Sequence, residues 1–482
     1  MASVFDQRVT HTALQRVNVE YETVNRGAPD IHLAWAALVE KVDRYNLYWD
    51  YYDGRHPMLY NASKLRDVFT ELDTTFNENW TAVVVNAVLD RIAIERFQVG
   101  EDDALGAEVF DLWRASGLDL DAYDAHLCAL VTGESFIVCG EDEDGPHAYF
   151  NDSRLCHMFY YQGRPNVPRF AVKWWEDTNV NPGRVTTYVT LYYPDRFEYY
   201  QVDRAFTEIA DGRAFVLTET APNPYGVIPV HHLRRERRRI ISEIADVIPL
   251  QAQLNKLLAD MMVAAEYGAF RQRYVISMVA GNVKLRNAPN EIWNLPAGDG
   301  EGQQTSVGEF GATELRNYLD AIDRAANVIA TVASIPKTLL FSGGALPSGA
   351  SLRALEAPLV KKAERYAHRW EPVWADVLRW LAGVGLGRAL AETDIDVVWT
   401  DPGTSDSEGT AAVTKTYVEA GMPLVTALRR QGWTDAEIEA MAADRAEEQA
   451  AGASLAAAYM AAAETNASRQ QGEMTENAAS GT

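Results

Sequence analysis

The chain has 482 residues, of which 47% are hydrophobic and 23% are charged, and its 68 acidic and 44 basic residues give a formal net charge of −24. This composition is that of a folded protein long enough for more than one core. Because proteins neutralise phosphates with clustered lysines and arginines, the acidic balance argues against a protein that grips nucleic acid over most of its surface.

Several kinds of segment and site are missing from the sequence. The apolar runs are short and MASVFDQRVTH at the N-terminus has no apolar signal core, so we expect neither a membrane span nor a secretion signal, and a cytoplasmic origin. Cys128, Cys139 and Cys156 form no CxxC pair, which predicts buried thiols and no metal site. Phosphate-loop, GxGxxG, HExxH and GxSxG motifs are absent, so we expect no cofactor.

The N-terminal part is predicted to be helical. Residues 1 to about 30 have little pattern and are expected to fray, whereas apolar residues between Ile31 and Tyr52 predict helical segments that end at the Asp53-Gly54 turn. A second helical face follows after residue 79. Its apolar residues are Trp80, Val84, Val88 and Ile92.

Short β-branched and aromatic segments begin at Phe136. They are FIVCG, AYF, RFAVKWW, VTTYVTLYY, RFEYYQV and AFVLTE, separated by turn residues such as Asp144-Gly145 and Pro194-Asp195. This pattern predicts an antiparallel meander of about five or six strands.

The strongest basic run, RRERRR, covers Arg234 to Arg239. Such a run can contact phosphates. It can equally form an interface network between subunits, given Glu236 within it and the many acidic residues elsewhere.

Two helices are predicted on either side of an irregular insertion. The first covers Ser242 to Tyr267, with Pro249 as an internal complication, and the second covers Thr313 to Ala333. The segment between them, Tyr274 to Gly311, is rich in Gly, Asn and Pro.

A small-residue loop and a long helix follow. Gly343, Gly344, Pro347 and Gly349 supply backbone freedom but no packed core, which predicts a mobile loop. The helix is predicted from Ser351 to Leu381, with Ser348 or Ser351 as its cap. Its apolar face consists of Leu352, Leu355, Leu359, Ala363, Tyr366, Trp370, Val373, Val377 and Leu381.

Two features modify this long helix. Pro358 and Pro372 each remove an amide, so we expect kinks. Lys361, Arg365 and Arg369 share one stripe, which on its own is most simply a solvated face.

The C-terminal part begins with a predicted strand at Ile395 to Asp401. Short helices follow, with Gly421-Met422-Pro423 as a stop, and the composition beyond Glu464 predicts disorder.

Two groups of residues could instead indicate chemistry. Glu141 to Asp144 offers paired carboxylates for acid-base or metal-dependent chemistry, although a hairpin turn is the simpler interpretation. His231 and His232 could suggest a metal or a proton shuttle, but adjacent residues of an extended segment point apart.

Four sequence segments, in this order, resemble tailed-phage portal proteins of the SPP1-like family, in the branch found in siphophages of actinobacteria. The segments are YYDGRHP (Tyr51 to Pro57), NWTAVVVNAVLDRIAIERFQVG (Asn79 to Gly100), LVTGESFIVCG (Leu130 to Gly140) and the SGxSLRxxE run (Ser348 to Glu356). The resemblance covers nearly everything from about Tyr51 to Met441.

The resemblance implies an α+β portal fold. Its parts would be N-terminal helices and a strand-rich wing (1–234), a stem helix (235–272), a small α/β clip (273–311) and a second stem helix (312–334). A tunnel loop (335–350), a long kinked helix that returns to the wing (351–404), a helical crown (405–465) and a disordered tail (466–482) would follow.

The function implied is structural and not enzymatic. Portal proteins form a ring, usually a dodecamer, at one capsid vertex, through which double-stranded DNA is packaged and ejected. The expected partners are other copies of the chain, DNA in the channel, the terminase large subunit, the head-tail adaptor, and the major capsid and scaffolding proteins, with no membrane. The expected location is the virion, after assembly in the host cytoplasm.

The resemblance also implies a set of site residues. The lumen-facing loop would comprise Lys337, Thr338, Ser342, Gly343, Gly344 and Ser348, with Lys337 as the expected phosphate contact, or alternatively a solvated side chain at a helix end. Further basic residues for DNA or subunit contacts are Arg234, Arg235, Arg237, Lys361 and Arg365.

Two alternatives remain open at this point. One is a phage-associated hydrolase that uses Glu141 and Asp142 beside the aromatic strands. The other is a different ring-forming head or tail component.

Overall fold

The computed structural model describes residues 30–56, 78–100, 103–143, 145–181, 184–269, 273–276, 306–309, 311, 314–340, 348–388, 390, 395–403, 407–431, 433, 437–447 and 449. The predictions for the first 29 residues, most of the clip, the centre of the tunnel loop and the tail lie outside these residues. The chain divides into two compact units, Met1–Gly403 and Thr404–Thr482, and the fold is a mixture of helices and sheets as predicted.

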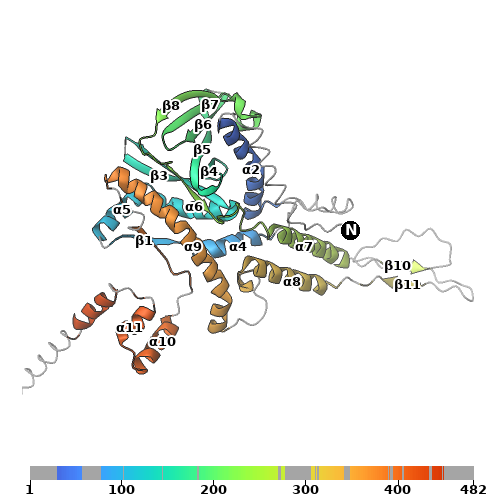
Figure 1. Cartoon of the computed structure of the whole chain (residues 1–482). Coiled ribbons are helices and arrows are strands. Elements are labelled where there is room, and N and C mark those ends of the chain that lie inside the picture. The colour runs from blue at the N-terminus through green and yellow to red at the C-terminus, as the bar shows by residue number, and fades with distance from the viewer. Residues whose placement is uncertain are drawn as a thin grey trace, which may run out of the picture. The chain divides into compact units, whose positions relative to one another are not determined.

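The larger unit contains both helices and sheets (Figure 1). Its α-helices are α2 (Asp30–Tyr52), α4 (Trp80–Leu89), α5 (Asp103–Ala115), α6 (Leu118–Thr132), α7 (Ile248–Ala269), α8 (Arg316–Ala333) and α9 (Gly349–Gly385). Short 3-10 helices are η1 (Phe206–Glu208), η2 (Gly212–Ala214) and η3 (Lys337–Leu339). In the smaller unit, α10 (Ser407–Glu419) packs on α11 (Leu424–Arg430).

The strands form four antiparallel sheets. The largest has the order β4-β5-β6-β7-β8, and a three-stranded sheet has the order β3-β2-β9. Two further pairs are β1 with β12 and β10 with β11. The strands are β1 (Ile94–Val99), β2 (Glu134–Asp142), β3 (Gly145–Asn151), β4 (Cys156–Tyr161), β5 (Arg164–Asn181), β6 (Arg184–Tyr192), β7 (Arg196–Val202), β8 (Val216–Pro222), β9 (Val230–Arg234), β10 (Arg273–Ile276), β11 (Ser306–Glu309) and β12 (Ile395–Trp399).

Four of the six segments predicted for the meander are neighbours in one sheet, as β5 to β8, whereas the first two lie elsewhere and β4 was not predicted. FIVCG and AYF belong to β2 and β3, which form a separate sheet with β9. Phe136 in β2 pairs with His232 in β9, and alternation of side chains does not reveal a pairing so distant in sequence.

Four layers make up the core of the larger unit. Helix α2 covers one face of the five-stranded sheet, where Trp35 packs near Phe170 and Val172. The other face packs on β2 through Phe136 and Val138. The far side of the three-stranded sheet is covered by α6 and α9.

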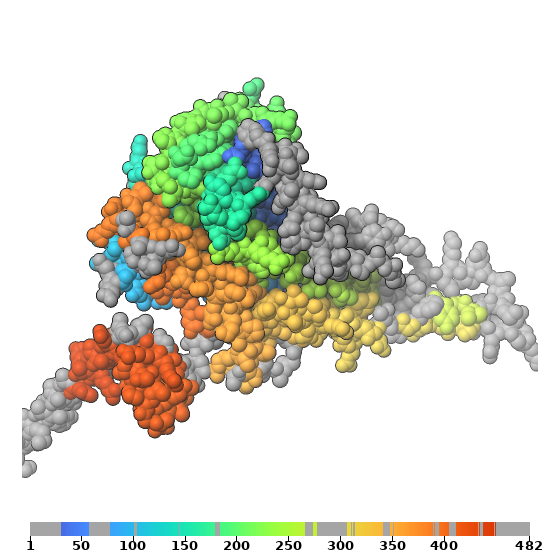
Figure 2. All heavy atoms as spheres, viewed as in Figure 1, coloured from blue at the N-terminus to red at the C-terminus, as the bar shows by residue number. Residues whose placement is uncertain are grey.

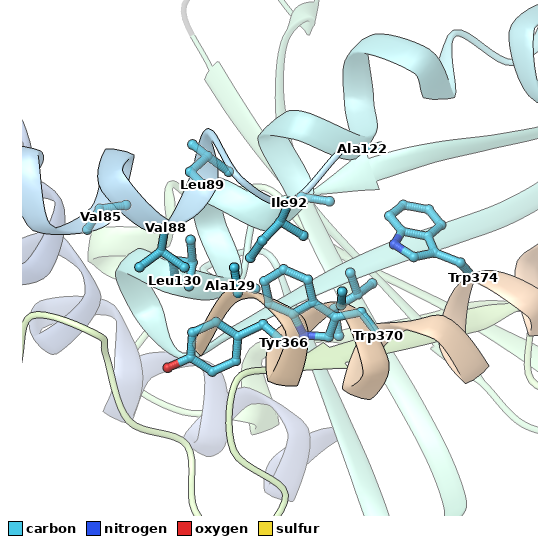
Figure 3. Packing of buried hydrophobic residues seen from close by; sticks show 14 of the residues in the cluster. Val85, Val88, Leu89, Ile92, Ala122, Ala129, Leu130, Tyr366, Trp370 and Trp374 are labelled. Atoms are coloured by element: carbon cyan, nitrogen blue, oxygen red, sulfur yellow. The ribbon is translucent and has the colours of Figure 1, made fainter. Parts of the chain in front are cut away.

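Helix α9 has the buried face that its spacing predicts over most of its length. Tyr366, Trp370 and Trp374 follow one another along α9, with Trp370 next to Ala129 of α6 (Figure 3), and all belong to one buried cluster. Leu355 was predicted on this face but is 48% exposed. Figure 1 shows the reason, because the first turns of α9 extend past the helices that cover the rest.

Prolines mark one correction to the helix boundaries. The first stem helix begins at Ile248, six residues later than predicted, so Pro249 lies in its first turn and not in its interior. Proline is tolerated there because the amide it lacks would have no partner within the helix. Helix α9, in contrast, includes Pro358 and Pro372 in its interior.

A buried carboxylate, Glu134, joins the layers. Lys41 Nζ of α2 lies 3.0 Å from Glu134 Oε1, and His232 Nε2 of β9 lies 2.9 Å from Oε2. Since a carboxylate only accepts, His232 Nε2 carries the proton, and Nδ1 accepts from the Tyr160 hydroxyl at 2.9 Å. Burial alone would raise the pKa of Glu134, but Lys41 and His232 outweigh it and hold this pKa well below its usual range. We call these four residues, with Tyr45, the Glu134 cluster.

Candidate functional site

The predicted tunnel loop is bounded by two ordered ends. Helix α8 ends at Ala333, where Ser334 adopts a left-handed conformation (φ 55°) and turns the chain toward η3. On the other side, the Ser348 side chain accepts from the Ser351 amide and caps α9. The loop centre, 341–347, which includes Ser342, Gly343 and Gly344, lies outside the described residues.

Lys337, the expected phosphate contact, lies in η3 beside α8. Its Nζ is 2.6 Å from Asp323 Oδ1 of α8, and its side chain is 33% exposed. Thr338 follows and is half-buried. The charge of Lys337 is therefore already balanced within the chain, and contact with a phosphate would need it to exchange this partner.

A second buried carboxylate, Glu243, anchors the start of the loop. The Arg235 guanidinium lies 2.8 Å from Glu243 Oε2, the Tyr366 hydroxyl donates to the same oxygen at 2.6 Å, and Lys362 pairs with Oε1. Lys362 also donates to the carbonyl of Ala333 at the end of α8. We call these five residues the Glu243 cluster.

This cluster fixes both helices that flank the loop. Lys362 belongs to α9 and donates to Ala333 at the end of α8, so this lysine, paired with the Glu243 carboxylate, connects the two sides. The side chains of Glu243 and Lys362 are 3% and 7% exposed. Burial has the largest single effect on the pKa of Arg235 and lowers it, but Glu243, Tyr366 and Glu236 together outweigh burial and raise the pKa above its usual value. Removing the sole partner of a buried charge costs about 3–5 kcal/mol, and Glu243 has two cationic partners.

The LVTGES segment explains why Glu243 lies there. Gly133 has φ +99°, and a Cβ at this position would lie 2.7 Å from backbone atoms of Ile241. Only glycine lets the chain around 241 pass this close, and the Glu243 amide then donates to Leu130 O at 2.9 Å. The segment thus supplies Glu134 to one cluster and positions the carboxylate of the other.

The five basic residues predicted from the sequence lie in three places. Arg235 is in the Glu243 cluster, which removes it from the surface cations. Arg234 stacks 4.8 Å from the Tyr160 ring, and the exposed Arg237 donates to Asn166 at 2.8 Å. Lys361 and Arg365 lie together on the exposed face of α9.

Figure 2 shows the orange atoms of α9 reaching the surface next to the yellow atoms of α8. The side chain of Lys361 is 81% exposed, and its Nζ lies 3.9 Å from Glu364 Oε2, which is a long distance for an ion pair. Arg365 lies 5.8 Å from the Tyr366 ring. This pair and the exposed Arg237 are members of the predicted basic set that solvent or a polyanion can reach.

Sequence reasoning missed three members of the Glu243 cluster. Lys362 did carry a signal, because it interrupts the apolar stripe between Leu359 and Ala363 and so lies on a buried face. A buried lysine needs a partner. Glu243 and the Tyr366 hydroxyl carried no local signal, since only the fold brings them to Lys362.

The carboxylates of the hydrolase alternative do not converge. Glu141 and Asp142 are consecutive and exposed at the end of β2, so their side chains face opposite sides of the hairpin. Among the described residues, no group of three or more His, Cys, Asp or Glu side chains is arranged to hold a metal ion. Nor does any helix in this part of the chain have the length and apolar character to cross a membrane.

Comparison with known proteins identifies the class. A family model described as "Phage portal protein, SPP1 Gp6-like" matches residues 31–451. The chain therefore belongs to this family of phage portal proteins, which confirms the resemblance found in its sequence.

Individual relatives agree with the family match. The chain is 25% identical to the portal protein of Mycobacterium phage L5 over 359 residues, which are 69% of this chain and 71% of the relative. It is 24% identical to the portal protein of Mycobacterium phage D29 over 400 residues, or 77% and 79%. A chain of the solved structure "Neck of empty GTA particle computed with C6 symmetry" gives a TM-score of 0.42 at 12% identity, covering 76% of this chain and 91% of that one.

Proposed function

We propose that copies of this chain form a dodecameric ring at one capsid vertex, and that the ring is a structural conduit for packaging and ejecting double-stranded DNA. In the virion, it would dock the terminase large subunit and the head-tail adaptor and contact the major capsid and scaffolding proteins. Membership of the portal family supports this proposal. It also disfavours the phage-associated hydrolase and the different ring-forming head or tail component. No observation in the described residues supports either alternative.

The observation that carries the proposal is the anchoring of the loop. The two helices that flank this segment of small residues are joined by Lys362, which pairs with the buried Glu243 and donates to Ala333. We propose that Lys337, Thr338, Ser342, Gly343, Gly344 and Ser348 line the channel.

Charge supports the same function. A chain of net charge −24 repels DNA over most of its surface, while exposed cations such as Lys361 and Arg365 offer weak contacts. DNA that must slide needs contacts that form and break easily, and each phosphate contact adds a salt-dependent term to affinity.

The test is to stiffen the loop. Gly343→Val with Gly344→Val should leave ring assembly unchanged, because the change lies in the loop. It should shorten the packaged genome and lower the titre of the phage at least tenfold, because valine at both positions removes backbone freedom. Ala411→Val with Ala412→Val adds the same bulk to exposed positions of α10 and should change neither. Normal packaging by the loop variant would contradict the assignment of the channel loop.

A further inference from the structure

A cavity of about 730 Å³ lies at the free side of β9, between the β4–β5 strands and the second half of α9. His231 and His232 both line it although they point to opposite faces of β9. The cavity therefore lies along the edge of β9 that pairs with no other strand of the described residues. Much of its wall is apolar, including Met158, Ile228 and Trp380.

The polar groups of this cavity are mostly hydrogen-bond donors. The buried Nε atom of Arg379 and the Nε1 atom of Trp380 have no hydrogen-bond partner in the described chain. Both groups can only donate. Arg234 and Arg237 also line the cavity, and Asp376, which pairs with Arg379, is the one acidic residue of the wall. A cavity with three arginines and one aspartate fits a ligand that combines carboxylates with apolar atoms.

The same chain displays a surface of that chemistry on α6. Leu120 is 74% exposed and Tyr123 is 49% exposed. They lie on one face of the helix. The exposed Asp119 is four residues before Tyr123, and the exposed Asp124 is four residues after Leu120, so each aspartate lies next to one of them. Neither aspartate forms an ion pair within the described residues. We call these four residues the α6 knob.

The cavity and the α6 knob lie at different edges of one sheet. The order of that sheet is β3-β2-β9. The Phe150 amide of β3 donates to Asp121 Oδ2 at 2.7 Å, so the first turns of α6 lie beside β3. The cavity lies beside β9, and β2 separates the two. One copy therefore cannot place its own knob in its own cavity.

We propose that the α6 knob of one copy of this chain inserts into the β9 cavity of the next copy, which makes this a head-to-tail contact of the ring. Leu120 and Tyr123 would fill the apolar part, and Asp119 and Asp124 would accept from the arginines and from Trp380. Two different complementary patches on each subunit give a heterologous interface, which closes into a ring when the rotation fits. The inference rests on the proposed ring and adds the surfaces that form it.

The first experiment changes the knob. Leu120→Arg should reduce the fraction of purified chain that elutes as rings at least tenfold, measured by size-exclusion chromatography with light scattering, because the arginine faces the cavity's own arginines. Leu217→Arg is the matched control, since Leu217 is 50% exposed on β8 and lies outside both patches. Because Leu120 is an exposed side chain, its variant should stay folded, with the far-UV circular dichroism spectrum of the wild type.

The second experiment mixes two defective chains. The cavity variant Val227→Arg, at a residue that lines the cavity and is 52% exposed, should also remain monomeric. Mixed with Leu120→Arg, it should form 1:1 dimers and no rings, because each mixture contains one intact knob and one intact cavity per pair. Rings formed by Leu120→Arg at the wild-type level, or a mixture that stays monomeric, would overturn the inference and leave the proposed ring standing. A wild-type chain that forms no ring would contradict both.

Discussion

The two buried carboxylate clusters differ in how many cations hold them. In the Glu134 cluster, Lys41 is the one cation among the described residues that pairs with the carboxylate. His232 and the Tyr45 hydroxyl also donate to Glu134, but both are neutral. Burial lowers the pKa of His232 despite the opposing effect of Glu134, which keeps the ring neutral at pH 7.

In the Glu243 cluster, two cations share one carboxylate. Arg235 pairs with Oε2 and Lys362 pairs with Oε1. The Glu134 cluster therefore depends on a single cation, and without Lys41 we expect it to stop stabilising the contact between the layers. The Glu243 cluster has a spare cation, because Arg235 alone could balance the carboxylate. Lys362 can therefore also donate to the carbonyl of Ala333 at the end of α8.

The largest effect is expected from Lys41→Met. The substitution keeps the length of the side chain but leaves Glu134 buried without a cation, so the free energy of unfolding should fall by about 3–5 kcal/mol. Urea unfolding of the purified chain measures it. A loss below about 1 kcal/mol would mean that the neutral donors alone hold the carboxylate.

A smaller effect is expected from the matched change Lys362→Met. Arg235 and Tyr366 remain on Glu243, so the loss should be about 1.5–3 kcal/mol, typical of a hydrogen bond to a charged group. Because the contact to Ala333 is also lost, hydrogen exchange at the end of α8 should increase. Equal losses for Lys41→Met and Lys362→Met would contradict the idea of a spare cation.

The smallest expected effect is on the pH dependence of the free energy of unfolding. It distinguishes the two clusters because only the Glu134 cluster contains a histidine. Burial lowers the pKa of His232 in the folded chain, so as pH falls through the ordinary histidine pKa of about 6.5 the unfolded chain binds a proton there before the native chain does. The free energy of unfolding should therefore fall as pH falls, by up to about 1.4 kcal/mol per unit for this residue.

The matching variant tests this directly. His232→Gln should make the pH dependence of the free energy of unfolding shallower by up to that amount, whereas Lys362→Met should leave the slope at its wild-type value. An unchanged slope in His232→Gln would show that the proton is bound equally in both states.

The sequence predicted those parts of the fold that depend on local patterns. The three-and-four spacing of α9 from Leu359 onward and the short strand β12 both followed from side-chain periodicity. The split between the two sheets did not, because the pairing of β2 with β9 depends on the whole fold. The family resemblance was confirmed by a match over residues 31–451.

The candidate site was less accessible from the sequence. The run at Arg234 to Arg239 looks uniform, yet Arg235 turns inward to Glu243 while Arg237 stays exposed. Both residues follow the end of β9, where the chain bends, so strand alternation does not set their directions. Which of them is buried depends on the contacts with Glu243 and α9. The channel roles of Ser342, Gly343 and Gly344 remain predictions.

The central claim is that copies of this chain close into a ring. The most direct test is negative-stain imaging of the purified wild-type chain combined with its native mass. The proposed function predicts closed rings of about twelve subunits with a central hole. A compact monomer with no ring at any concentration tested would contradict it.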